Sequence, residues 1–190
     1  MSTHRHFMIH KPFGFLSQFV TRQTKRKPRL LGELHNFPEG TMSIGRLDKD
    51  SEGLLLLTTD GKVSSLITGR KYEKEYYVQV DGEITEEAVA QLKSGVEISV
   101  EKQAYFTRAD HAIKLGTEPD FPPRAKKIRD ARHGPTSWIS ITISEGKFRQ
   151  VRKMTAAVGF PTLRLIRVRI GELKLGSLQT GQFREVDNLL

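Results

Sequence analysis

The chain has 190 residues and a net charge of +9, because 31 lysines and arginines outnumber 22 acidic residues. This length allows one sizeable domain or two lobes, and the basic charge favours a polyanionic partner. Cysteine is absent, which excludes disulfides, thiolate zinc sites and a cysteine nucleophile. The sequence has neither the roughly 20 apolar residues of a membrane span nor the apolar core of a signal peptide. We therefore expect a soluble, cytoplasmic protein.

The N-terminal part of the chain predicts a short tail followed by extended structure. Residues 1–6 are polar and basic, so we expect a flexible end or a cloning remnant rather than part of the fold. Residues 7–11 predict a first strand, and residues 12–14, Pro-Phe-Gly, are typical of a tight turn. Extended structure is expected to resume over residues 15–20, and this spacing favours a hairpin.

A basic segment follows at residues 22–29, which contain no acidic residue. Such a segment cannot be core, so it predicts a solvated loop that either grips phosphates or is simply exposed surface. A short helical turn is expected over residues 30–34. The cations of the basic segment are Arg22, Lys25, Arg26, Lys27 and Arg29.

The central stretch is an acidic loop, residues 45–53, followed at once by four leucines. The leucines at 54–57, with Asp60-Gly61 as a turn signal behind them, predict a strand buried on both faces. The loop is therefore anchored to the core, and an anchored loop can hold a carboxylate still for chemistry.

The acidic residues of this loop allow several interpretations. An EF-hand would match at the start, but its ninth and twelfth positions would be Leu56 and Thr59, which cannot supply the required ligands. A glycosidase-type carboxylate pair is the second interpretation, since Asp48, Asp50 and Glu52 are close in sequence. Solvated or capping carboxylates are the third.

The middle of the chain predicts two helices and two strands, followed by a long connecting loop. A helix over 63–69 precedes a strand over 71–80, and a helical stripe over 84–92 precedes a strand over 96–100. Residues 116–135 are rich in proline and basic residues, which predicts a connecting loop that is either a second phosphate contact or a mobile flap.

The C-terminal part predicts a strand over 136–144 and a helix that runs from about 145 to 158. Phe148, Val151 and Val158 would share one helix face and pack on the sheet. Residues 163–170 predict another strand, and short strands and turns follow to residue 186. Strands outnumber helices without regular alternation, so we expect an α+β fold with a mainly antiparallel sheet.

Four motifs in this chain resemble those of the RNA pseudouridine synthases, in particular the branch that modifies ribosomal RNA. The most specific is Gly-Arg-Leu-Asp-x-x-Ser-x-Gly-Leu-Leu over residues 45–55. Lys-Pro-x-Gly with a following serine, over 11–17, resembles the first motif of that family. Lys-x-Tyr-x-Val over 74–78 and Glu-Gly-x-x-Arg-Gln-Val-Arg-Lys-Met over 145–154 resemble the two others.

The resemblance implies roles for individual residues. Those enzymes break the glycosidic bond of uridine, turn the uracil and rejoin it through carbon 5, without metal or cofactor. By the family pattern, Asp48 acts on the ribose as nucleophile or base, and Arg152 pairs with it. Val151 would form an apolar wall and Tyr76 would lie against the uracil. Arg46 would fill the gap left by the extruded uridine.

The resemblance also implies an architecture, a long mixed sheet bent into two lobes around a central cleft, with residues 7–190 as the catalytic domain. That branch often carries an N-terminal S4 domain, for which residues 1–6 leave no room. The implied partner is ribosomal RNA, in particular 23S, bound by a monomer. The alternative is a non-catalytic rRNA-binding or ribosome-assembly module. The expected RNA-binding residues are Arg22, Lys25, Arg26, Arg29, Arg149, Lys153, Arg164, Arg167 and Arg169.

Overall fold

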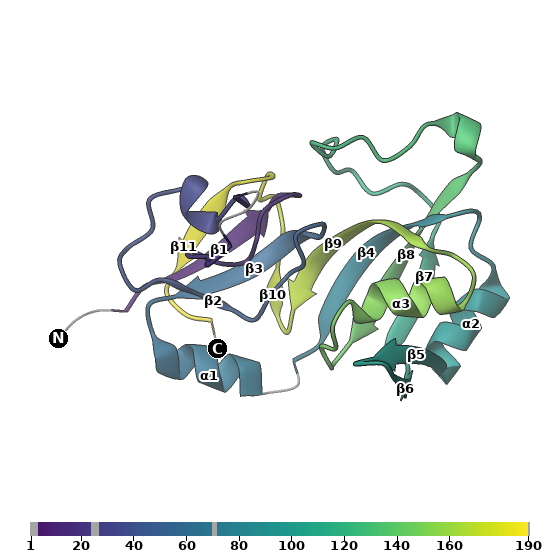
Figure 1. Cartoon of the computed structure of the whole chain (residues 1–190), viewed down its shortest axis with the longest axis horizontal. Coiled ribbons are helices and arrows are strands. Elements are labelled where there is room, and N and C mark those ends of the chain that lie inside the picture. Colours follow the sequence, from purple (N-terminus) through teal and green to yellow (C-terminus); the bar gives the residue numbers. More distant parts are fainter. Residues whose placement is uncertain (1–3, 24–26, 70–71, 190) are drawn as a thin grey trace. The chain divides into compact units, whose positions relative to one another are not determined.

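The computed structural model describes residues 4–23, 27–69 and 72–189. Contacts divide the chain into two units, residues 1–72 with 167–190 and residues 73–166 (Figure 1). Strand β9 (Thr162–Ile170) contributes its first half to the second unit and its last half to the first. None of the helices that the structure describes is long and apolar enough to cross a membrane.

The first unit is a sheet with the order β11-β1-β3-β9, in which β2 also pairs with β3 and β10 with β9. Strand β3 is buried along its whole length, as the leucine run predicts. The pairings of β3 with β1 and β2 are antiparallel. The elements of this unit besides β9 are β1 (His6–Lys11), η1 (Leu31–Glu33), β2 (Met42–Ile44), β3 (Glu52–Thr58), α1 (Gly61–Gly69), β10 (Leu173–Lys174) and β11 (Phe183–Val186).

The second unit continues from β9 through β4 and β8 to β7, and a separate hairpin pairs β5 with β6. Helix α3 packs against β5 and α2 against β7. The long connection between β7 and β8 extends beyond the ends of these strands (Figure 1). The elements are β4 (Lys74–Asp81), α2 (Glu86–Ser94), β5 (Val96–Val100), β6 (Gln103–Thr107), β7 (His111–Leu115), η2 (Ala131–His133), β8 (Thr136–Ile143) and α3 (Gln150–Ala157).

The predicted fold class is confirmed: the protein is α+β with a mixed, mainly antiparallel sheet. The predicted hairpin over residues 7–20 is wrong, because residues 15–20 form no strand and only Phe15 bridges to Arg29. The reason is that polar groups of this segment bind other loops. Leu16 donates its backbone N–H to the Arg29 carbonyl, and Ser17 binds Leu47.

Two further differences lie in the second unit. Strands β6 and β7 have no counterpart among the predicted elements, and helix α3 begins at Gln150 rather than near residue 145. Phe148 therefore precedes the helix, and its predicted packing on the sheet is wrong, since 70% of its surface is exposed. Val151, which does lie within α3, is buried as predicted.

Candidate active site

Backbone hydrogen bonds hold the loop that carries Asp48 on both sides of that residue. The Ser17 hydroxyl donates to the Leu47 carbonyl at 2.8 Å and accepts from the Leu47 N–H at 3.0 Å. On the other side, the Gly14 N–H donates to the Lys49 carbonyl at 2.7 Å. The half-buried Asp48 is thus fixed by residues of the 11–17 motif. The 11–17 motif and the loop that carries Asp48 are therefore joined by hydrogen bonds within the first unit.

Arg167 supports the same loop from strand β9. Its guanidinium is buried, with 4% exposure of the residue, and Nε donates to the Leu54 carbonyl at 2.8 Å while Nη1 reaches the Arg46 carbonyl at 3.4 Å. Gly53 lies against the backbone of Arg167, and a Cβ at Gly53 would stand 2.3 Å from the Arg167 carbonyl oxygen. This close approach explains the glycine that ends the acidic loop.

Lys11 is a fully buried cation near the acidic loop. Its ammonium donates to the carbonyls of Pro12 and Phe15 at 2.9 and 2.8 Å. Burial lowers the pKa of Lys11 from 10.5 to about 7, although nearby carboxylates oppose this shift. The Lys11 side chain therefore lies close enough to the carboxylates of the loop to interact with them. The carboxylates are those of Glu52, Asp50 and Asp48.

Stability should depend on pH through Lys11. Because its pKa falls from 10.5, the ordinary value of a solvated lysine, to about 7 in the fold, the unfolded chain binds more protons there between those values. The free energy of unfolding is therefore expected to rise as pH increases from about 7 toward the higher value. Lys11→Met has no group to titrate, so this contribution should vanish. Urea unfolding of both proteins across this range measures it, and parallel curves would contradict it.

The second unit supplies the other residues with predicted catalytic roles. Tyr76 lies on β4 opposite Ile141 of β8, and its side chain is buried. Val151 is buried on α3, and Arg152, the next residue, is half-buried. Tyr76 therefore belongs to the core face of its strand, where only a small part of its surface can meet a ligand.

A polar network holds the 145–154 motif against strand β6. The Gln150 amide donates to Glu145 and to Thr107, both at 2.8 Å, and accepts from the Lys147 N–H at 2.8 Å. The Tyr105 hydroxyl donates to Glu145 at 2.6 Å. Burial alone would raise the pKa of Glu145, but hydrogen bonds from Thr107, Tyr105 and Gln150 lower it. Glu145 is therefore an ionised anchor for the loop that precedes α3.

The residues predicted to bind RNA differ in their surroundings. Arg22 and Arg29 are exposed, and Arg149, Lys153 and Arg169 are half-buried. Lys25 and Arg26 lie outside the described residues. Buried side chains are found instead at Arg164 and Arg167, at 5% and 4% exposure, and both donate to backbone carbonyls.

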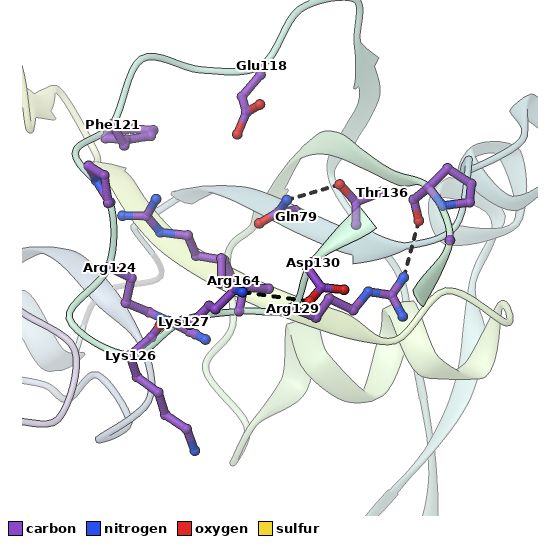
Figure 2. Close-up of a pocket in the computed structure, with 14 residues that line it drawn as sticks. Gln79, Glu118, Phe121, Arg124, Lys126, Lys127, Arg129, Asp130, Thr136 and Arg164 are labelled. Atoms are coloured by element: carbon purple, nitrogen blue, oxygen red, sulfur yellow. Dashed lines mark hydrogen bonds and ion pairs between the residues drawn. The ribbon is translucent and has the colours of Figure 1, made fainter. Parts of the chain in front are cut away.

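The connection between β7 and β8 lines an open, basic pocket of about 560 Å³ together with residues of β4, β8 and β9 (Figure 2). Gln79 and Thr136 line one side and Phe121 another, and Glu118 points toward the hollow from the loop. Arg164 donates to the Pro122 carbonyl at 2.9 Å, which ties the loop to β9. The lining cations are Arg124, Lys126, Lys127, Arg129 and Arg164.

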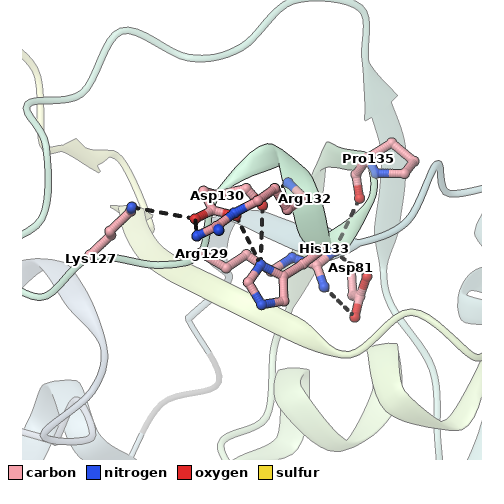
Figure 3. A network of polar contacts seen from close by, with 7 residues as sticks. All are labelled: Asp81, Lys127, Arg129, Asp130, Arg132, His133 and Pro135. Carbon is pink, nitrogen blue, oxygen red and sulfur yellow. Dashed lines mark hydrogen bonds and ion pairs between the residues drawn. The ribbon is translucent and has the colours of Figure 1, made fainter.

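Ion pairs hold the far end of this loop (Figure 3). Arg129 makes a two-pronged ion pair with Asp81 at the end of β4 and also donates to the Pro135 carbonyl. Asp130 binds Arg132 and His133 through short-range contacts within the loop. The Arg129–Asp81 pair joins residues 48 positions apart, and no sequence pattern indicated it.

Asp81→Asn should loosen the loop. The substitution removes the charge that holds the mostly buried Arg129 guanidinium, so the loop should open more often and trypsin should cleave after residues 124–132 several-fold faster. Limited proteolysis followed by mass spectrometry gives the rate. Glu83→Gln breaks the exposed Lys114–Glu83 pair and serves as control. Equal cleavage of Asp81→Asn and wild type would contradict the role of the pair.

Comparisons with known sequences agree with the motifs. Residues 5–157 match the family described as RNA pseudouridylate synthase. Ribosomal large subunit pseudouridine synthase E of Xanthomonas campestris is 42% identical over 95% of this chain and 94% of its own length. The Vibrio parahaemolyticus protein of the same name is 39% identical over 94% of this chain and 72% of its own. Ribosomal large subunit pseudouridine synthase B of Bacillus subtilis is 33% identical, covering 95% and 67%.

Solved structures agree as well. One described as a crystal structure of pseudouridylate synthase aligns with a TM-score of 0.72 and 28% identity, covering 98% of this chain and 71% of that one. A chain from an H/ACA RNP bound to a substrate RNA containing 2′-deoxyuridine aligns with a TM-score of 0.56, covering 90% and 48%. Its identity is 16%, so this likeness concerns the fold alone.

Proposed function

The chain belongs to the RNA pseudouridylate synthase family, and we propose that it converts one specific uridine of ribosomal RNA to pseudouridine. The substrate we propose is 23S rRNA of the large subunit. This choice rests on 42% identity across 94% of a relative named for that subunit. The observation that supports catalysis is Asp48 on a loop whose backbone is held on both sides by residues of the first motif.

The proposed chemistry needs one carboxylate that acts on the ribose and stays in place. Asp48 is that group, as nucleophile or as base at the sugar, and Arg152 is the cation that pairs with it. Val151 forms an apolar wall for the detached base. Tyr76 lies against the uracil. These roles are carried over from the family motifs, residue by residue.

The uridine must leave its stack before it can react, so the proposed substrate is a loop or weakly paired segment from which the base is flipped out. Arg46 has the role of filling the vacated space, and its side chain is exposed on the catalytic loop. The phosphate contacts that we propose come from the exposed or half-buried cations. For Arg164 and Arg167, which are buried, we propose a supporting role instead.

We propose that the enzyme is a cytoplasmic monomer. It is proposed to use no cofactor, because the isomerisation changes neither the oxidation state nor the composition of the nucleotide. The rival function is a non-catalytic rRNA-binding or assembly module. That rival needs the basic surface but has no use for the carboxylate of Asp48.

Mapping on unmodified transcripts tests the proposal. Wild-type protein is incubated with 23S and 16S rRNA transcripts, and pseudouridines are located by carbodiimide labelling and reverse transcription. One new stop in 23S rRNA is expected. A stop confined to 16S rRNA would overturn the choice of subunit. Tight binding without any stop, on naked RNA and on partly assembled particles, would favour the assembly module.

A further inference from the structure

Phe148 projects from the loop before α3 with 70% of its surface exposed. The next residue, Arg149, has φ 54° and ψ 33°, the left-handed region that residues other than glycine and asparagine seldom adopt. Arg149 is the N-cap of α3. The fold thus maintains a strained backbone next to an exposed aromatic ring, and strained backbone conformations cluster at functional sites.

Lysines flank this ring and a second aromatic residue. The Lys153 ammonium lies 5.4 Å from the Phe148 ring centroid and donates to the Ser99 carbonyl at 2.6 Å. The Lys147 ammonium lies 5.0 Å from the ring of Tyr105. We call Phe148, Tyr105, Lys147 and Lys153 the aromatic platform.

Hydrogen bonds hold two residues of the aromatic platform, Tyr105 and Lys153, in place. The Tyr105 hydroxyl donates to Glu145, which also accepts from Gln150, so the Tyr105 ring is held in place. The carbonyl of Ser99 uses one of three ammonium donors of Lys153, which leaves the others for a ligand. Each of the two rings has a lysine ammonium beside it, and a ring paired with a cation suits a flat, anionic ligand.

We propose that the aromatic platform binds an unpaired nucleotide of the RNA substrate, with the base stacked on Phe148 and the adjoining phosphates contacted by Lys147 and Lys153. The inference rests on the proposed function, because it assumes that this chain binds its RNA directly. The net charge of +9 and the pairing of each aromatic ring with a lysine favour RNA over a protein partner. None of these four residues has a proposed role in the chemistry.

The test uses binding of a single-stranded RNA oligonucleotide that spans the modified uridine, followed by fluorescence anisotropy. Phe148→Ala should weaken binding about tenfold and leave the salt dependence unchanged, while Phe148→Trp should bind like wild type. Phe106→Ala is the matched control. Phe106 follows Tyr105 on β6 and so points to the opposite face, and it is exposed to 67%. It should bind like wild type.

The lysines should affect a different quantity. Lys147→Gln and Lys153→Gln should each lower the slope of log affinity against log salt by about 0.7. An abasic scan of the oligonucleotide then locates the stacked base. At one position, removal of the base should weaken binding to the wild-type protein but should not weaken binding to Phe148→Ala any further. The reason is that loss of the base and loss of the Phe148 ring remove the same contact.

The outcomes separate this inference from the proposed function. If wild type forms pseudouridine but Phe148→Ala binds as tightly as wild type, or no more weakly than Phe106→Ala, the platform is overturned and the enzyme stands. Additive losses at every abasic position would also overturn the stacking contact. If wild type modifies no transcript, the proposed function fails, whatever Phe148→Ala does in binding.

Discussion

Asp48→Asn is expected to lower the single-turnover rate of pseudouridine formation by about a thousandfold or more. The amide has the shape of the carboxylate but neither its charge nor its nucleophilicity. The loop should remain in place, because its backbone is held through Ser17 and Gly14, which bind the residues on either side of Asp48. Carbodiimide mapping with enzyme in excess measures the rate, and RNA binding should change little.

Asp50→Asn is the matched control. Asp50 lies two residues further along the same loop, is also half-buried, and also acts on the pKa of Lys11. The variant makes the same change of charge in the same surroundings and should keep most of the activity. If both variants are equally slow, the activity depends on the total negative charge of the loop and not on the carboxylate of Asp48 in particular. If Asp48→Asn is fully active, the assignment of the catalytic group is wrong.

The sequence predicted those features that depend on local patterns. The leucine run located β3, and the strand predicted over residues 71–80 corresponds to β4. The motifs over 11–17 and 45–55 were recognised separately. Only the structure shows the hydrogen bonds between them, because these join residues at least 30 positions apart in the sequence. Such pairs leave no periodic signal.

The predicted elements were wrong at two places, where a polar side chain or the backbone conformation, rather than the hydrophobic pattern, determines the local structure. Ser17 binds Leu47 instead of a hairpin partner, so residues 15–20 form no strand. The left-handed conformation of Arg149 delays the start of α3 and leaves Phe148 outside it. A helical face drawn over residues 145–158 assumed uniform dihedral angles. One residue with positive φ is enough to invalidate it.

Gly53→Ala should destabilise the first unit by about 3 kcal/mol or more. A Cβ at this position would lie 2.3 Å from the carbonyl oxygen and 2.6 Å from the nitrogen of Arg167. Both atoms are backbone atoms of β9, so neither can turn aside. The φ of +104° adds conformational strain. Urea unfolding measures the loss, and activity should fall with it, since β9 also carries the Arg167 side chain that binds the catalytic loop.

Two other glycines separate the causes of this loss. Gly45 has φ +68° with no heavy atom near its virtual Cβ, so Gly45→Ala should cost only about 1 kcal/mol, the strain of a left-handed alanine. Gly61 begins α1 without such a φ and in open space, so Gly61→Ala should be near neutral. If Gly53→Ala lowers the free energy of unfolding no more than Gly45→Ala does, the close contact between Gly53 and β9 does not limit the residue at this position. A larger cost means that the glycine that ends the acidic loop is required for its close contact with β9.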